Sequence, residues 1–177
     1  MATPMKPIRI EVPFATPCFQ VLAKTLREGE DAWYSLRLPD YAATVAAVPD
    51  GRLVLVRQYR PAVEKATLEL PSGLVDEGES PEAAARRELL EETGYEAAEV
   101  EVVGPLLPDT GRLGNRIWCC VASGLRQAPA WTAEEGVEVV LVPPAELRQA
   151  ILDGRFDHAL HVAAVLLAGV RGKFALP

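Results

Sequence analysis

The stretch GLVDEGESPEAAARRELLEETGY, residues 73–95, places three carboxylates within five residues, behind a loop that contains two glycines. Glu88, Glu91 and Glu92 stand at i, i+3 and i+4, so a helix would put them on one face. Like charges at this spacing repel, and a divalent cation would neutralise them. The three acids alone are equally compatible with a solvated acidic face that needs no ligand.

The same stretch carries start and stop signals for one helix. Ser80 can cap a free backbone N–H, and Pro81 suits the first helical position because its missing donor has no partner there. Gly94 can adopt the left-handed conformation that closes the last turn. The sequence therefore predicts a helix over residues 81–93 that follows a sharply turning loop.

The order of these residues resembles a family signature, the Nudix box. The pattern is a glycine, five residues, a glutamate, seven residues, Arg-Glu, an aliphatic residue, one residue, Glu-Glu, one residue, a glycine and a bulky residue. Its positions are filled here by Gly73, Glu79, Arg87, Glu88, Leu89, Glu91, Glu92, Gly94 and Tyr95. Tyr95 stands where an aliphatic residue is more usual, and it still offers a large apolar body.

Resemblance to the Nudix hydrolases implies a site for Mg²⁺, or for Mn²⁺ in its place. In that family the box acids and a backbone carbonyl just before the glycine bind the ion, which implies the ligands Glu88, Glu91, Glu92 and Ser72. Arg87 and Glu79 would orient the acids. Mg²⁺ prefers such oxygen ligands and bridges to substrate phosphates. A plain ion pair of Arg87 with Glu91 at i+4 is compatible with the orienting role.

Length and composition suit one globular domain with an extension. The chain has 177 residues, 49% of them hydrophobic, and no apolar run approaches the 18 or so residues of a membrane span. We expect an N-terminal arm over residues 1–40 and a Nudix domain over residues 41–177. Residues 1–17 lack the pattern of a secretion signal, so we expect a cytoplasmic protein. The net charge of −7 argues against nucleic-acid and membrane partners.

Strand and helix signals alternate along the chain and indicate a mixed α and β fold. Residues 19–25 and 33–38 predict a hairpin in the arm, and residues 42–48 and 53–58 predict a second hairpin around Asp50-Gly51. Later strands are expected over residues 100–107, 117–122 and 137–142, with helices over 144–152 and 158–170. The Nudix resemblance implies an α/β/α sandwich.

Three cysteines are present, and two of them are adjacent. Cys119 and Cys120 would point to opposite faces of one strand, and Cys18 has no partner at a zinc-binding spacing. We expect all three to be core thiols rather than disulfides or metal ligands.

Segments outside the box are similar to those of ADP-ribose pyrophosphatases and related nucleotide-sugar hydrolases. These are residues 57–60 (RQYR), 69–73 (ELPSG) and 154–159 (GRFDHA). By this resemblance Arg57 and Arg60 hold the diphosphate or ribose, and Glu69 contacts the sugar side or supports the metal site. The fork of an arginine suits phosphate. The alternative for these side chains is an exposed charge at a sheet edge.

In those homologues the arm commonly exchanges between two subunits, which implies a homodimer. Aromatic residues near its second strand can stack on adenine, and Trp33 and Tyr34 occupy that place, although a strand aromatic more often belongs to a core. Residues 108–112, PDTGR, depart from the proline-rich loop usual in the subfamily, and Arg112 or Arg116 could contact phosphate there.

The general base would come from a loop after the box. The acids available there are Glu134 and Glu135, of which we favour Glu135; the alternative is a pair of solvated loop acids. For His158 and His161, at the start of an apolar helix, we expect capping or packing rather than catalysis.

The resemblance implies Mg²⁺-dependent hydrolysis of a nucleoside diphosphate sugar, a small-molecule substrate. ADP-ribose, which would give AMP and ribose 5-phosphate, is the leading candidate. GDP-mannose or another nucleotide sugar is the alternative. A Nudix domain that binds ADP-ribose without cleaving it is more remote, because such proteins usually lose box acids that this chain keeps.

Overall fold

The computed structural model describes residues 5–175, and the chain divides into two compact units. The arm unit covers the chain up to Asp40 together with Leu107–Arg116. The core unit comprises Tyr41–Leu106 and the chain from Ile117 onward. Residues 107–116 thus join the arm, whereas the sequence analysis placed them in the second domain. They do so because Leu36 donates its N–H to the carbonyl of Arg112 and accepts from Gly114.

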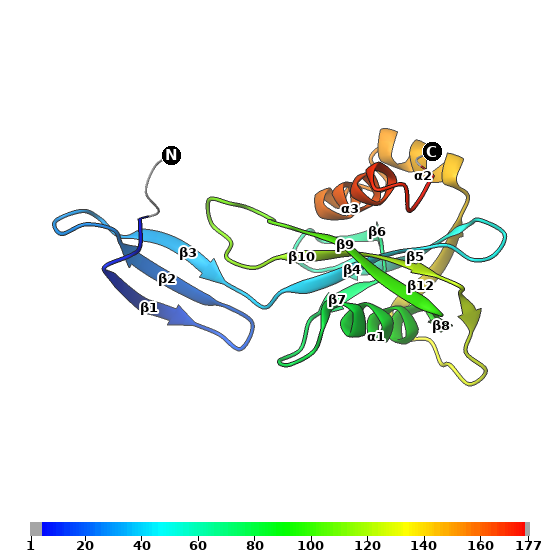
Figure 1. Ribbon diagram of the computed structural model, residues 1–177, viewed down its shortest axis with the longest axis horizontal. Helices are drawn as coiled ribbons and strands as arrows, with labels where there is room; N and C mark the ends of the chain where they lie inside the picture. Colours follow the sequence, from blue (N-terminus) through cyan, green and yellow to red (C-terminus); the bar gives the residue numbers. More distant parts are fainter. Residues whose placement is uncertain (1–4, 176–177) are drawn as a thin grey trace. The chain divides into compact units, whose positions relative to one another are not determined.

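The arm unit is an antiparallel sheet in the order β1-β2-β3 (Figure 1). Its strands are β1 (Arg9–Ala15), β2 (Gln20–Thr25) and β3 (Trp33–Arg37). The pairing of β2 with β3 confirms the predicted hairpin. Strand β1 was not expected from the sequence; it pairs with β2 although every one of its residues is exposed.

The core unit holds the remaining elements in three sheets and three helices. Its strands are β4 (Tyr41–Ala46), β5 (Leu53–Arg60), β6 (Lys65–Glu69), β7 (Ser72–Leu74), β8 (Tyr95–Glu96), β9 (Glu99–Leu106), β10 (Ile117–Ser123), β11 (Arg126–Gln127) and β12 (Val137–Val142). Its helices are α1 (Pro81–Thr93), α2 (Pro144–Leu152) and α3 (Ala159–Val170). The sheets run β7-β4-β10-β9, β12-β5-β6 and β11-β8.

Side chains alternate along β4 and β10 between two apolar layers, as a strand's period of two requires. Ala43 and Cys119 pack in one cluster with residues of α2 and α3, while Ala42 and Cys120 pack in another with Ala84 of α1 and its neighbours. Within the core unit, α1 lies on one side of the strands and α2 and α3 on the other (Figure 1). The expected α/β/α sandwich is therefore confirmed.

The predicted second hairpin is wrong as a pairing. β4 lies beside β10 and β7, whereas β5 lies between β12 and β6 in a different sheet. The Asp50-Gly51 turn forms, yet the two strands join only at a single bridge, Ala47 to Leu53. β4 is buried at all but its first residue and β5 over its first half, so packing into two layers overrides the local turn signal.

The cysteine prediction holds in part. Cys119 and Cys120 are buried free thiols on opposite faces of β10, whereas Cys18 is exposed. Cys18 lies in the turn between β1 and β2, where its N–H donates to the hydroxyl of Thr16 and its side chain faces no core. Among residues 5–175, no helix is long and apolar enough to cross a membrane.

Candidate functional site

Helix α1 presents the acids of the box, and both of its ends are fixed as expected. The Ser80 hydroxyl accepts from the N–H of Ala83 at 3.2 Å. Gly94 adopts a left-handed φ of 71°, and its N–H donates to the carbonyl of Leu90 at 2.9 Å. The predicted range of residues 81–93 is confirmed. The two caps therefore fix where the helix begins and ends, and with it the positions of the acids along the helix.

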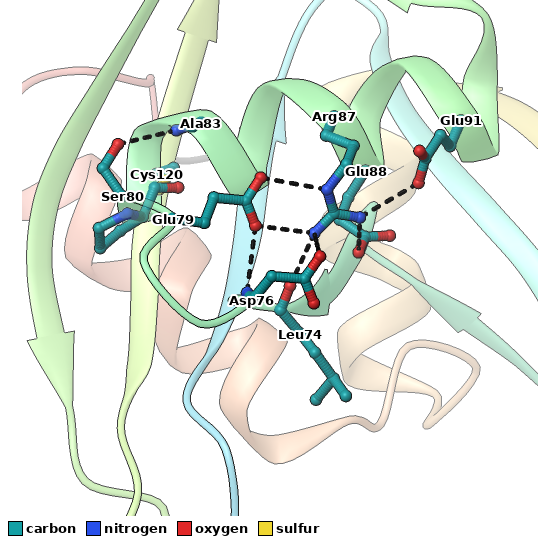
Figure 2. A network of polar contacts seen from close by, with 10 residues as sticks. Leu74, Asp76, Glu79, Ser80, Ala83, Arg87, Glu88, Glu91 and Cys120 are labelled. Atoms are coloured by element: carbon teal, nitrogen blue, oxygen red, sulfur yellow. Dashed lines mark hydrogen bonds and ion pairs between the residues drawn. The ribbon is translucent and has the colours of Figure 1, made fainter.

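Arg87 lies at the centre of a polar network on this helix (Figure 2). Its Nε and Nη2 donate to the two carboxylate oxygens of Glu79 at 3.1 and 2.9 Å, and Nη2 also donates to the carbonyl of Leu74. Its Nη1 donates to Glu88 at 2.6 Å and to Glu91 at 3.2 Å. Hydrogen bonds from Arg87 to Glu79 and Glu88 raise its pKa. One guanidinium thus ties the preceding loop to two acids of the helix.

Glu92 and Glu88 carry unfavourable charges in this structure. Glu92 is 7% exposed, and its carboxylate accepts from the N–H of Ser72 at 2.9 Å. Burial, and then the charges of Glu88 and Glu134, raise the pKa of Glu92 to about 7 despite that hydrogen bond. Burial also raises the pKa of Glu88, against the opposing effect of Arg87. A nearby cation would relieve both acids.

Gly73 makes room for the Glu88 carboxylate. A Cβ built on Gly73 would lie 2.0 Å from the carboxyl carbon of Glu88 and 2.0 Å from its Oε1. Any residue other than glycine would push that carboxylate away. The glycine, the oxygen-only donors and the raised pKa values together fit a hard divalent cation.

The box acids do not surround a single point in this structure. Among residues 5–175, the one set of three acids, histidines or cysteines with ligand atoms all within 4.8 Å of one another is Glu69, His158 and His161. Arg87 instead bonds to Glu88 and Glu91. Ion binding would therefore bring these acids closer together than they stand here.

Glu69 is buried beside this region in an ion pair. It is 1% exposed, and both of its oxygens accept from Arg60, at 2.9 and 2.7 Å. The hydroxyl of Thr67 donates a third bond at 2.6 Å. Burial acts to raise the pKa of Glu69, but the bonds from Arg60 and Thr67 outweigh it and lower the pKa to about 2. Glu69 is thus an anion that holds Arg60 in one orientation.

His158 and His161 cap and pack, as the sequence analysis expected. His158 is the N-cap of α3 and stacks on His161 with ring centroids 3.8 Å apart. His161 is 1% exposed, and its Nδ1 accepts from the N–H of Leu70 at 3.1 Å. Burial, and then the nearby His158, lower the pKa of His161 to about 3. The ring is therefore neutral, and its Nδ1 is already engaged by a backbone N–H.

The loop that carries the two candidate bases is attached to α1 by Trp131. The indole N–H of Trp131 donates to the carbonyl of Glu91 at 2.9 Å, and a Cβ on Gly94 would lie 2.5 Å from the indole ring. Glu134 and Glu135 are both exposed. Glu134 lines a surface hollow of about 490 Å³ together with Glu91 and Trp131. Sequence reasoning missed Trp131, because Gly94 shows only a helix-end signal in the sequence.

The other expected binding residues lie at the surface. Arg57 pairs with Glu138 of β12 at 2.9 Å, and both side chains are about half exposed or more. In the arm unit, Trp33 is 58% exposed, and its indole donates to the carbonyl of Gly111. Arg112 of the same unit pairs weakly with Asp109 at 3.5 Å. The structure thus places Trp33 beside the PDTGR loop.

Comparisons with known proteins agree with the box. The sequence model of the NUDIX domain matches residues 38–164. A methanol dehydrogenase activator of Bacillus methanolicus is 33% identical over 133 residues, which cover 73% of this chain and 72% of that protein. An ADP-ribose pyrophosphatase of Mycobacterium tuberculosis is 33% identical over 140 residues, which cover 76% of this chain and 68% of that protein.

A solved structure shows the same fold along nearly the whole chain. A crystal structure of an ADP compounds hydrolase superposes with a TM-score of 0.79 at 26% identity, covering 98% of this chain and all of the other. The match of the NUDIX domain to most of the sequence agrees with this superposition. The chain therefore belongs to the Nudix family of hydrolases, and its relatives there include an ADP-ribose pyrophosphatase and an ADP compounds hydrolase.

Proposed function

We propose that this Nudix hydrolase uses Mg²⁺ to cleave the diphosphate of a nucleoside diphosphate sugar, with ADP-ribose as the leading substrate. The products would be AMP and ribose 5-phosphate. The observation that carries the proposal is a pair of acids with raised pKa values, the buried Glu92 and the half-buried Glu88, which call for a cation next to Gly73. The names of two relatives, ADP-ribose pyrophosphatase and ADP compounds hydrolase, support the substrate class.

The residues that would hold the ion are Glu88, Glu91, Glu92 and the carbonyl of Ser72. When bound, Mg²⁺ polarises the phosphorus and lowers the pKa of an attacking water. Mn²⁺ suits the same oxygen donors. Glu92 already anchors the segment before Gly73 through the N–H of Ser72, so the helix acids and this carbonyl are held in register.

Arg87 and Glu79 would orient the acids before any ion binds. Glu79 takes the Nε and Nη2 edge of the guanidinium, which directs Nη1 to Glu88 and Glu91. A bidentate pair of this kind restrains rotation as well as position. Glu79 therefore acts on the acids through Arg87, without contacting the ion.

The remaining proposed roles are contacts with the substrate. Arg57 and Arg60 would hold the diphosphate or ribose, with Arg60 aligned by Glu69. Glu69, whose negative charge is paired with Arg60, would support this part of the site. Trp33 is exposed as a stacking surface for adenine requires, and Arg112 would add a phosphate contact.

The general base would be a glutamate of the loop around Trp131. The sequence favours Glu135. The structure adds support for Glu134, because its charge contributes to the raised pKa of Glu92 and it lines the hollow beside Glu91. A carboxylate within reach of the attacking water could accept its proton. Turnover of the two Gln variants separates these assignments.

A homodimer through the arm is part of the proposal. Strand β1 carries large apolar side chains that are about half exposed, namely Ile10, Val12 and Phe14, with Ile8 just before them. An edge strand with such side chains favours a covering partner. A second copy of the arm would provide one.

The cytoplasmic location expected from the sequence also stays a prediction.

Turnover of ADP-ribose, GDP-mannose and ADP-glucose with Mg²⁺ tests the proposal, with products separated by chromatography. Glu92→Gln should abolish turnover, and Glu99→Gln, at an exposed acid of β9, should leave it unchanged. Preference for GDP-mannose or ADP-glucose would keep the mechanism and reassign the substrate. Tight ADP-ribose binding without metal-dependent cleavage would instead favour a sensor.

A further inference from the structure

The four residues before Gly73 form a segment that different elements hold, residue by residue. Both sides of the core unit take part, since α1 and α3 lie on opposite sides of its strands (Figure 1). Glu69 is held by Arg60 of β5, and the Pro71 carbonyl accepts from the N–H of Thr44 on β4. The remaining two contacts join this segment to the helices: Leu70 to His161 of α3, and Ser72 to Glu92 of α1.

The contact from α3 is a buried hydrogen bond between Leu70 and His161, and it defines the tautomer of the histidine ring. Leu70 is 0% exposed and His161 is 1% exposed. Because Nδ1 of His161 accepts from the N–H of Leu70, the proton of the neutral ring resides on Nε2. Nε2 is buried and has no hydrogen-bond partner within the part of the chain that the structure describes.

This arrangement excludes two simpler roles for His161. A metal ligand needs a free lone pair, and in this tautomer neither nitrogen offers one, so the proximity of Glu69 and His158 does not make a metal site. A general base needs the same lone pair. The ring acts on its surroundings through Leu70.

We propose that His161 is a positioning residue for the metal site, which sets the place of the Ser72 carbonyl through the N–H of Leu70. Leu70 lies two residues before Ser72, and the intervening Pro71 has a fixed φ, so a shift at Leu70 passes on to Ser72. Glu92 holds Ser72 from the α1 side, and His161 opposes it from the α3 side. This inference rests on the proposed function, because it assumes that an ion binds at Ser72 and the box acids.

Two substitutions of His161 by residues of similar size and shape, Asn and Leu, separate positioning from packing. His161→Asn removes the ring but keeps an oxygen acceptor near the place of Nδ1, whereas His161→Leu removes the ring and the acceptor. Val165→Ala is the matched control, because Val165 is a buried residue of the same helix and its truncation weakens packing alone.

The measurement is Mn²⁺ binding by calorimetry in the absence of substrate. Thermal unfolding of the same proteins in chelator measures their stability without metal. His161→Leu should weaken Mn²⁺ binding by about tenfold or more, as loss of a residue that orients a metal ligand typically does. His161→Asn should recover most of that loss although it also lacks the ring. Val165→Ala should lower the melting temperature and leave Mn²⁺ affinity unchanged.

Contrary results would distinguish this inference from the proposed function. Mn²⁺ binding that requires Glu92 but is the same in the Leu and Asn variants would overturn the positioning role alone. Mn²⁺ binding that survives Glu92→Gln would refute the proposed site, and this inference with it. If the Leu variant does not fold, ¹⁵N spectra of the wild-type ring decide: a proton on Nδ1 would overturn the inference, and one on Nε2 would support it.

Discussion

Gly73→Ala is the sharpest test of the acid site, because its effect on folding should differ from its effect on activity. The new Cβ would lie 2.0 Å from the carboxyl carbon and Oε1 of Glu88 and 2.3 Å from Oε2, well inside van der Waals contact. These atoms are the far end of a flexible side chain, so Glu88 can swing away. The carboxylate must move by more than about an ångström to reach ordinary contact distance.

The cost to stability should be small. The φ of Gly73 is outside the left-handed region, so alanine fits its backbone, and lower entropy of the unfolded chain contributes about 0.4–1 kcal/mol of stabilisation. Loss of the Arg87–Glu88 contact would cost roughly 1 kcal/mol or less, because the pair is only partly buried. These two effects nearly cancel, and the melting temperature should stay within a few degrees of wild type.

The cost to activity should be large. A misplacement of about 1 Å in a reacting constellation costs on the order of 10²-fold in rate. We expect this loss in Mg²⁺-dependent turnover of the preferred nucleotide sugar, measured beside thermal unfolding. Gly51→Ala is the inverse control: its φ of 89° strains an alanine but nothing lies within 4 Å, so it should lose about 1–2 kcal/mol of stability and no activity. Near-normal turnover of Gly73→Ala would refute the idea that Gly73 is needed to make room for the Glu88 carboxylate.

Four further predictions concern the other parts of the site and the arm. The raised pKa of Glu92, about 7 against an ordinary 4.5, means that the native state binds this proton more tightly than the unfolded state does, so its contribution to stability falls as pH rises from 4.5 to 7. In chelator, Glu92→Gln should therefore raise the melting temperature relative to wild type at pH 7.5 and not at pH 4.5; an equal shift at both pH values would contradict this. Trp131→Phe removes the indole bond to the Glu91 carbonyl but keeps an aromatic ring. Denaturant unfolding should show a loss of about 1 kcal/mol, which leaves the protein folded, so a fall in turnover measured beside it would come from the displaced loop and not from unfolding. Of Glu134→Gln and Glu135→Gln, the variant at the general base should lose about 10²–10⁴-fold in turnover with unchanged Mn²⁺ affinity; if neither does, the base lies elsewhere. Ile10→Glu places a charge on the exposed face of β1 and should halve the mass found by light scattering, and an unchanged mass would argue against a dimer through this strand.

Elements that are defined by local signals could be predicted from the sequence, and those defined by distant partners could not. The ends of α1 and α2 match their expected residues, because Ser80, Pro81 and Gly94 mark both ends of α1 and prolines mark the start of α2. Strand β1 offers no buried alternation, and it forms only because β2 supplies a partner. The separation of β4 and β5 into two sheets likewise depends on β10 and β12, which lie far along the chain.

The candidate site follows the same division. The box acids and Arg87 were predictable because their spacing acts within one loop and one helix. The contact of His161 with Leu70 spans 91 residues, and that of Trp131 with Glu91 spans 40. No periodicity or local motif encodes either of them. These contacts between distant elements therefore became visible only in three dimensions.

The spacing of Glu79 and Arg87 now has a physical explanation. The sequence left open whether Arg87 merely pairs with Glu91 one turn away or orients the acids, and the structure shows a single guanidinium bonded to both Glu88 and Glu91, which is compatible with either role. It can do so because Glu79, at the end of the loop before the helix, occupies the opposite edge of the fork. Without Glu79, Arg87 could rotate to either acid and would leave the other uncompensated. The loop glutamate thus fixes the orientation in which one guanidinium reaches Glu88 and Glu91 together, while Glu92 is held separately by the N–H of Ser72.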